Sequence, residues 1–305
     1  MHNKIAVAIG LSCLTAAFAR EPINTVSEVT DQYKLPNMDA VMGKFTYSNE
    51  MDFEDIDGSL SVTEIDFLSV LSRPITVGGD IMLLPFVQYG LTSFDFDGVD
   101  NSFPIADEDL HSVSLHLAAL KYDKSSPWLY GAWVRAELAS DFQHINGDDF
   151  TFDVAGGVGY RYSDNFMIGV GGAVLGINGD TWFCPGINFD WVVSDKVRVG
   201  LYGPMPVVSY TPNDDWSFSL RGNPGGGIWN ITDDNGDSKD VDLSSYQVGA
   251  YAGRRLTGKL WLNAGVGMTL MNNITYSDSG GDNDTLDEDM DAGWFGQIGL
   301  SLKTW

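Results

Sequence analysis

Apolar and polar side chains alternate along most of this chain, which is the period of β-strands rather than of helices. Residues 150–162 show the pattern most clearly. Large or apolar side chains share one face and small or polar ones the other: Phe150, Phe152, Val154, Val158, Tyr160 and Tyr162 against Thr151, Asp153, Ala155, Gly157, Gly159 and Arg161. Aromatic residues at both ends of the apolar face are typical of a membrane-crossing strand with its rings at the two lipid–water boundaries.

The alternating segments are joined by connections of two kinds. Short polar turns are expected at residues 124–127, 163–165, 194–196 and 257–258. Longer, acidic connections are expected at residues 95–109, 141–149, 178–180, 233–242 and 277–291. Short turns at one end and long loops at the other are typical of outer-membrane barrels, whose long loops face outward. This arrangement predicts an all-β fold, a closed antiparallel up-and-down transmembrane β-barrel.

The number of strands depends on one stretch of the chain. Residues 41–53 form the first expected strand and residues 293–305 the last, and the count between them is even, about 12 or 14. The stretch in question is 203–229, where Gly203-Pro-Met-Pro206, Pro212-Asn-Asp-Asp215 and Asn223-Pro-Gly-Gly226 interrupt short apolar runs. Because proline removes a ladder donor, each break is a turn, a bend or a bulge. Three turns give 14 strands, and a bulge in place of one lowers the count to 12.

Both ends of the chain carry export features. Lys4, the apolar stretch 5–15 and Ala17-Phe18-Ala19 predict a signal peptide over residues 1–19. Residues 20–40 are expected to form a periplasmic segment, and residues 41–305 the barrel. The last segment alternates and ends on Trp305, which resembles the terminal assembly signal of outer-membrane barrels, although Trp305 falls on the opposite face from Ile298, Leu300 and Leu302.

Composition agrees with a sheet-rich membrane protein. The chain has 35 glycines, 37 aromatic residues and 11 prolines, which suits strands and turns. No stretch approaches the ~18 consecutive apolar residues of a transmembrane helix. A mean hydropathy of −0.07 is what barrel strands produce, because half of their residues face the lumen.

The net charge is −25, from 42 acidic and 17 basic residues, with the excess in the long connections. Such loops repel phosphate, which excludes nucleic acid as a partner. A solvated surface is the simplest interpretation, and weak binding of Ca²⁺ or Mg²⁺ by carboxylate oxygens is the alternative. The candidate ligands are Asp95, Asp97, Asp100, Asp233 and Asp237, none of them within an EF-hand pattern. No other cofactor is expected.

Catalysis is not indicated. The chain after the predicted signal peptide has three histidines, and His116 shares the expected lumen face with Ser114. Side chains two residues apart along a strand are ~6.5 to 7 Å apart, so we expect no hydrogen bond within this pair. The glycine-rich stretches lie within strands and do not open helices, so they are not dinucleotide sites. Cys184 is expected to be a small interior residue.

Charged residues on the expected lumen faces have mixed signs. Such side chains must pair across the lumen or face water. The pattern predicts a lumen that is either filled by ion pairs or open. The residues are Arg135, Glu137, Asp153, Arg161, Asp190, Arg198 and Arg255.

The stretch from Leu201 to Leu220 carries a family resemblance. Gly203-Pro-Met-Pro206, Tyr210 and Trp216, together with the hairpin pattern and the terminal aromatic strand, resemble a family of bacterial outer-membrane β-barrels of unknown function. The resemblance implies the barrel fold and an outer-membrane location, with no activity attached.

Together these features predict a porin-like or channel-like barrel that passes or binds small solutes. The alternative is a non-conducting structural or surface-interaction barrel with cation-binding acidic loops, and the third is an outer-membrane lipid hydrolase. The expected partners are outer-membrane lipids, lipopolysaccharide and the barrel-assembly machinery. If the barrel conducts, the acidic mouth favours cations, whereas lumenal arginines favour anions.

Overall fold

The computed structural model describes residues 39–99, 103–105, 108–123, 125–177, 181–233, 236–279 and 284–303. The predicted signal peptide, almost all of the predicted periplasmic segment, Asp100 and Trp305 lie outside these residues. The described chain contains sixteen strands: β1 Asp39–Asp52, β2 Ser59–Val70, β3 Ile75–Val77, β4 Ile81–Asp97, β5 Asp109–Tyr122, β6 Trp128–Ser140, β7 Phe150–Ser163, β8 Phe166–Ile177, β9 Trp182–Ser194, β10 Val197–Tyr202, β11 Met205–Asn213, β12 Trp216–Thr232, β13 Ser238–Thr257, β14 Leu260–Asp278, β15 Asp284–Met290 and β16 Gly293–Lys303.

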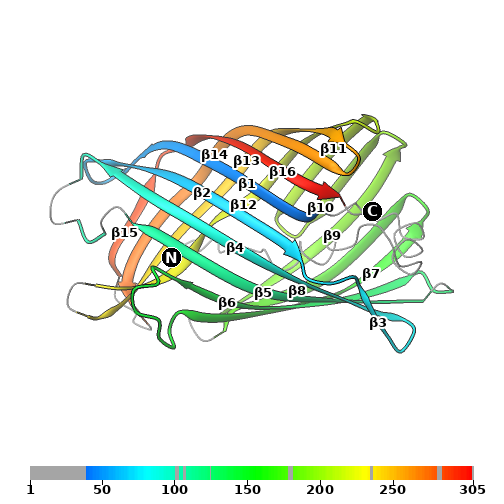
Figure 1. Ribbon diagram of the computed structural model, residues 1–305, viewed down its shortest axis with the longest axis horizontal. Helices are drawn as coiled ribbons and strands as arrows, with labels where there is room; N and C mark the ends of the chain where they lie inside the picture. Colours follow the sequence, from blue (N-terminus) through cyan, green and yellow to red (C-terminus); the bar gives the residue numbers. More distant parts are fainter. Residues whose placement is uncertain are drawn as a thin grey trace.

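Fourteen of these strands close into an antiparallel barrel (Figure 1). Each strand pairs with the next along the chain, and β1 closes the ring by pairing with β16. The other two strands are accessory. β3 folds back on the start of β4 and pairs with it. β15 and β16 both pair with β14, so β15 extends the wall beyond the end of β16. The predicted closed barrel and its higher strand count are confirmed.

The 14 strands arise differently from the expected three turns. Two of the three breaks in residues 203–229 are turns, which flank β11. The third is not a turn, because residues 223–226 lie inside β12 and pair without a register shift with β13. Gly226 adopts a φ of 87°, a conformation open to glycine, which allows β12 to continue through this position. The prediction of a long connection at residues 277–291 was also wrong in part, since β15 occupies residues 284–290.

The two ends of the barrel differ as predicted. Two-residue turns join β7 to β8, β9 to β10 and β13 to β14 at the end that also holds the β3 hairpin and the C-terminal end of β16 (Figure 1). The connections between β4 and β5 and between β6 and β7 are longer and lie at the opposite end. We call these the short-turn end and the long-loop end.

The two faces of the wall separate apolar from mixed side chains. On β5, Leu115 is 56% exposed and faces outward, whereas His116 is 2% exposed and faces the lumen. The outer face of the barrel is apolar and aromatic along most of its strands, as a lipid-facing surface requires. Among the described residues, no helix is long and apolar enough to cross a membrane.

Opposite walls of the barrel meet at the long-loop end. Asn230 near the end of β12 forms a parallel bridge with Ser140 at the end of β6, although these strands are not neighbours in the barrel. Both residues are buried. Around this contact lies an apolar cluster from nine strands and two residues outside them, Phe53 and Ile105. We call it the outer cluster: Met51, Phe53, Leu60, Val62, Phe94, Ile105, Leu110, Ala139, Trp229, Ile231, Val241, Leu243, Ile274, Tyr276 and Met290. The lumen is therefore packed shut by wall side chains at this end.

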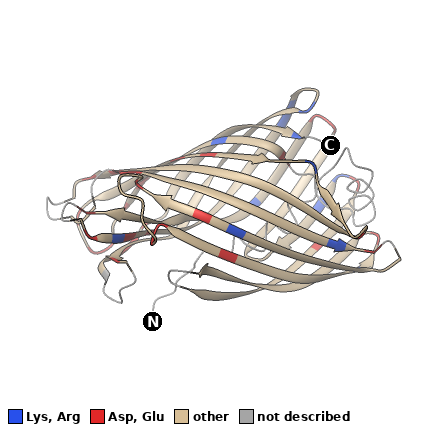
Figure 2. Cartoon of the chain, turned by 60° about the horizontal axis from the view of Figure 1, so that its bottom comes forward, with Lys and Arg blue, Asp and Glu red and all other residues tan. Residues whose placement is uncertain are grey.

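A second apolar cluster lines the lumen on one side only. It comes from β4 to β8, and we call it the lumen cluster: Met82, Leu84, Phe86, Ala118, Leu120, Tyr122, Leu129, Trp133, Ala155, Met167, Ala173 and Leu175. Charged residues interrupt the strands at mid-barrel but leave most of their length uncharged (Figure 2). The interior thus combines apolar walls with a few ionic groups.

Candidate functional site

The best-connected ionic group in the lumen is centred on Arg135. Its guanidinium contacts the Asp153 carboxylate at 2.5 Å and the Glu137 carboxylate at 2.9 Å. Asp153 also accepts a hydrogen bond from the backbone N–H of Gly176 at 2.9 Å. Neighbouring strands bring these residues together, because Arg135 and Asp153 are direct cross-strand partners in β6 and β7. The structure places all three in the lumen as a compact ion-paired group.

A second pair lies further round the wall. Arg198 of β10 donates from Nε to the Asp190 carboxylate of β9 at 2.6 Å and makes a second contact through its terminal nitrogen. Asp190 is 4% exposed, so this charge depends on its partner.

The remaining two predicted lumenal arginines lie at the short-turn end. Arg161 is within 3.9 Å of Asp164 in the β7–β8 turn. Arg255 contacts Asp215 in the turn between β11 and β12 at 2.7 Å, and both side chains are well exposed. These two arginines therefore line the rim of the lumen and not its centre.

Sequence reasoning missed another ionic group, on β1, β2 and β12. Lys44 pairs with Asp66 at 3.0 Å, and Glu64 lies beside them. Arg221 stacks over the ring of Tyr251 at 3.7 Å. The sequence carries the signal for this group, because the outward-facing Phe45 and Ile65 place the adjacent Lys44, Glu64 and Asp66 on the lumen face.

The expectation that Ser114 and His116 are too far apart was wrong. The Ser114 hydroxyl and His116 Nε2 are 2.7 Å apart, within hydrogen-bonding distance. The spacing estimate applies to parallel side chains, whereas here the His116 ring leans along the strand while stacking on Phe86 with ring centroids 4.3 Å apart. Both residues are almost fully buried. The arrangement resembles a serine–histidine pair, but packed side chains separate it from any substrate.

The wall formed by β6, β7 and β8 is hollowed on its lumen side by glycines. Gly157 pairs with Gly171, and Gly159 pairs with Gly169. A Cβ on Gly157 would lie 2.9 Å from the Val170 carbonyl oxygen, so glycine permits the close approach of these strands. A mainly apolar cavity of about 60 Å³ lies over the glycines, with walls that include Leu120, Leu129, Met167, Asn188, Asp190 and Tyr202.

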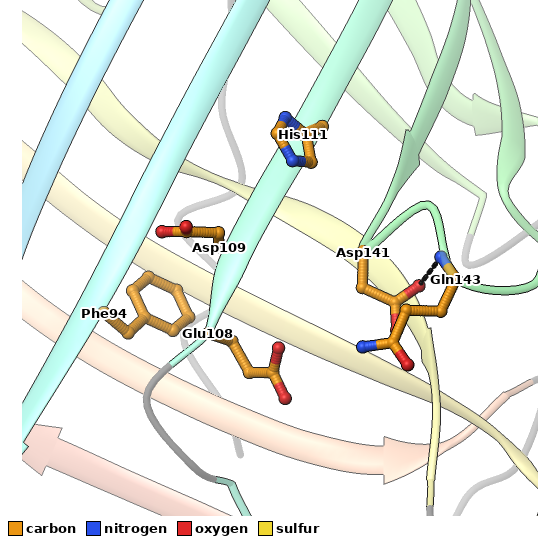
Figure 3. Close-up of a pocket in the computed structure, with 6 residues that line it drawn as sticks. All are labelled: Phe94, Glu108, Asp109, His111, Asp141 and Gln143. Carbon is orange, nitrogen blue, oxygen red and sulfur yellow. Dashed lines mark hydrogen bonds between the residues drawn. The ribbon is translucent and has the colours of Figure 1, made fainter.

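A larger pocket, of about 460 Å³, opens at the long-loop end (Figure 3). Its acidic walls are Glu108, Asp109 and Asp141, and burial together with Asp141 and Asp109 raises the pKa of the Glu108 carboxyl. The carboxylates diverge: Asp109 accepts a hydrogen bond from Ser93, and Asp141 accepts one from the Gln143 N–H. The adjacent His111 is held by Tyr89 at 2.9 Å.

The described part of the chain contains no group of three or more His, Cys, Asp or Glu side chains arranged to hold a metal ion. Of the candidate cation ligands, Asp95 and Asp97 lie at the exposed end of β4. The Asp233 carboxylate accepts the Asp237 N–H at 2.9 Å and lies 3.9 Å from Lys239, which places it within its own loop. Asp233 and Asp237 therefore lie together, but the described residues provide no third ligand that would complete a metal site there.

The fold and the lumen define an outer-membrane-type, channel-like β-barrel. Residues 87–303 match the family described as Domain of unknown function (DUF6268), and the chain belongs to this family. No curated protein matches the chain.

Several solved structures are similar to this barrel. The outer membrane channel COG4313 from Pseudomonas putida F1 has 11% sequence identity and a TM-score of 0.44, over 89% of this chain and 97% of that one. The Pseudomonas putida toluene transporter TodX has 9% identity and a TM-score of 0.32, over 97% of both chains. The β domain of the Bordetella autotransporter BrkA has 12% identity and a TM-score of 0.31, over 87% of this chain and all of that one. The activities in these descriptions are those of the named proteins.

Proposed function

We propose that this protein is a channel-like barrel of the bacterial outer membrane that binds and passes small solutes through its lumen. The uneven filling of the interior is the observation that carries the proposal. The outer cluster packs the lumen beside the acidic pocket of the long-loop end, whereas the β6–β8 wall carries glycines over an interior cavity of about 60 Å³. In a barrel with a purely structural role, an interior cavity would only lower the free energy of unfolding, because close-packed interiors are more stable than interiors with cavities.

The proposal assigns the barrier to the long-loop end. Trp229 packs edge-to-face on Phe94 with ring centroids 5.8 Å apart, and the Asn230–Ser140 bridge ties the two walls beside them. Passage through this end requires these contacts to open. The outer cluster would then act as the gate, and the cavity beside Asp190 and Arg198 would hold solute inside it.

A hydrolase is the weaker interpretation. Its only support is the hydrogen bond between Ser114 and His116, and an acyl-transfer nucleophile must reach its substrate. These side chains are 3% and 2% exposed. Their burial supports a structural role in the β4–β6 wall.

Planar-bilayer recording on the full-length protein, with matched proteoliposome uptake of small solutes, tests the proposal. We expect discrete conductance steps that become larger or more frequent in Trp229→Ala, since this removes the side chain at the centre of the outer cluster. Ile228→Ala changes an outward-facing neighbour, 43% exposed, and serves as the matched control. The absence of both conductance and uptake in the wild type and in Trp229→Ala would overturn the proposal.

A further inference from the structure

Along the long-loop half of the barrel wall, two strand edges have no neighbouring strand beside them among the described residues, apart from one bridge at Asn230. β10 is short and pairs only with Asn188–Ser194 of β9, and β11 pairs with β12 no further than Arg221. Residues 182–187 of β9 therefore pair with β8 alone. Residues 222–232 of β12 pair with β13, and across the other edge only Asn230 has a described strand partner, on β6. The wall is interrupted between β9 and β12 over roughly 20 Å of strand.

Both edges have the amino-acid composition typical of edge strands, which remain without a neighbouring strand. Residues 182–187 read Trp-Phe-Cys-Pro-Gly-Ile, and residues 222–228 read Gly-Asn-Pro-Gly-Gly-Gly-Ile. Each has a proline, which cannot donate to a neighbouring strand and occurs in sheets mainly at edges. Neither segment has a charged residue. The interruption therefore offers no electrostatic attraction to ions, and an apolar molecule can approach it without displacing water from a charged group.

An interrupted wall is costly at membrane depth unless it has a use. Backbone N–H and C=O groups that face hydrocarbon without a partner cost several kcal/mol each, so irregular backbone at this depth lines a cavity or is covered by protein. Two hydrogen bonds hold the tip of the β10–β11 hairpin at the border of the interruption that faces the short-turn end. The Tyr246 hydroxyl donates to the Pro204 carbonyl at 2.6 Å, and the Gly203 N–H donates to the Asn188 side chain at 2.8 Å.

An apolar surface leads from this interruption into the lumen. Trp182 on the free edge of β9 packs on the lumen cluster and is the cross-strand partner of Leu175. From there the cluster continues along β8 through Ala173 to Met167. Met167 borders the glycine-lined cavity. The apolar surface is therefore continuous from the wall to the cavity, while the long-loop end is shut by the outer cluster.

We propose that small, uncharged apolar solutes pass between the lipid and the lumen through the wall between β9 and β12. The proposal rests on the proposed function and adds to it a substrate class and a route. Its recognition elements are the uncharged free edges, the Trp182 ring and the lumen cluster, with the glycine-lined cavity as the holding site.

Cys184 lies in the middle of the free β9 edge and is a free thiol. It shares the lumen face with its partner Ala173, and it is partly exposed. The test measures entry of 1-N-phenylnaphthylamine into Gram-negative cells that express the full chain. We expect faster entry than in cells without the barrel and a return to the barrel-free rate in Cys184→Trp. Val266→Trp, on the outer face of β14, should keep the wild-type rate.

A chemical block covers the case in which Cys184→Trp does not fold. N-cyclohexylmaleimide, a lipid-soluble thiol reagent, should abolish the excess entry into wild-type cells and leave Cys184→Ala unaffected. Unchanged entry after complete modification of Cys184 would overturn the lateral route. So would formation of a Cys184–Cys184 cross-linked dimer in the membrane, because a second copy would then cover the edge.

The outcomes also separate this proposal from the proposed function. Ion conductance without any excess entry of the apolar probe would overturn the lateral route and leave a channel. Excess entry that depends on Cys184, without ion conductance, would support the lateral route and overturn passage of ions through the barrel. Neither signal, in correctly folded protein, would overturn both proposals.

Discussion

Replacing Arg135 with leucine should be among the most destabilising single changes in the lumen. Arg135 is the shared cation of Asp153 and Glu137, and the Asp153 side chain is 2% exposed. Without Arg135, Asp153 keeps one described hydrogen bond, from the Gly176 N–H. Breaking a buried ion pair by removing one partner costs about 3–5 kcal/mol, because an uncompensated charge remains. Arg135 is 19% exposed, so we expect a cost near the lower end, about 3 kcal/mol or a hundredfold in the unfolding equilibrium.

The assay is urea unfolding in detergent micelles, followed by loss of the heat-modifiable band on gels. Arg255→Leu is the matched control, since its partner Asp215 is 60% exposed and an exposed pair contributes about 0.2–1 kcal/mol. Adding Asp153→Asn and Glu137→Gln to Arg135→Leu should restore most of the lost stability, because the unpaired charges are removed. If Arg135→Leu costs no more than Arg255→Leu, the lumen at Asp153 is hydrated and the argument from a buried ion pair is wrong.

Three further predictions follow from other parts of the barrel. In a KCl gradient we expect reversal potentials that indicate weak cation preference, because Arg135 and Arg198 are neutralised by Asp153 and Asp190 while acidic loops remain at the mouth; clear anion selectivity would contradict this. Burial and neighbouring carboxylates raise the pKa of Glu108 above its ordinary 4.5, so its contribution to stability is greatest below pH 4.5 and is lost as the pH rises through the higher folded-state pKa. Glu108→Gln should therefore reduce the loss of thermal stability over that window, and an unchanged pH profile would refute the assignment. Gly157→Ala should destabilise the barrel by about 1–3 kcal/mol in the same urea assay, through the contact with Val170, whereas Gly156→Ala, whose Cβ has 3.7 Å of clearance, should be tolerated.

The sequence predicted local and repetitive features well. The outward faces of β5 and β7 follow from alternation alone, and the two-residue turns at 164–165 and 195–196 follow from their polar residues. The cross-strand pair Arg135–Asp153 was anticipated only as two inward charges of opposite sign. Their contact depends on the register between β6 and β7, which the sequence does not state.

The candidate site was predicted only in part, for a geometric reason. Arg135, Asp153, Asp190 and Arg198 were assigned to the lumen by parity, and in the structure they form two buried ion pairs between neighbouring strands. The same reasoning placed Arg255 in the lumen, but parity gives a face and not a depth, and its place near the end of β13 brings it to the rim. Ser114 and His116 were separated by an average spacing that ignored the rotation of a side chain about its own bonds.

Taken by itself, the sequence determines that this chain forms an antiparallel barrel with an apolar outside, short turns at one end and acidic loops at the other, because these features arise from residues near one another in the chain. Only the tertiary structure decides how far the barrel is open. The contact of Asn230 with Ser140, the packing of the outer cluster and the unpaired edges of β9 and β12 all join or separate residues far apart in the chain. Such relations depend on barrel closure and strand register, which set where each side chain lies across the lumen, and a period of two residues contains no information about either.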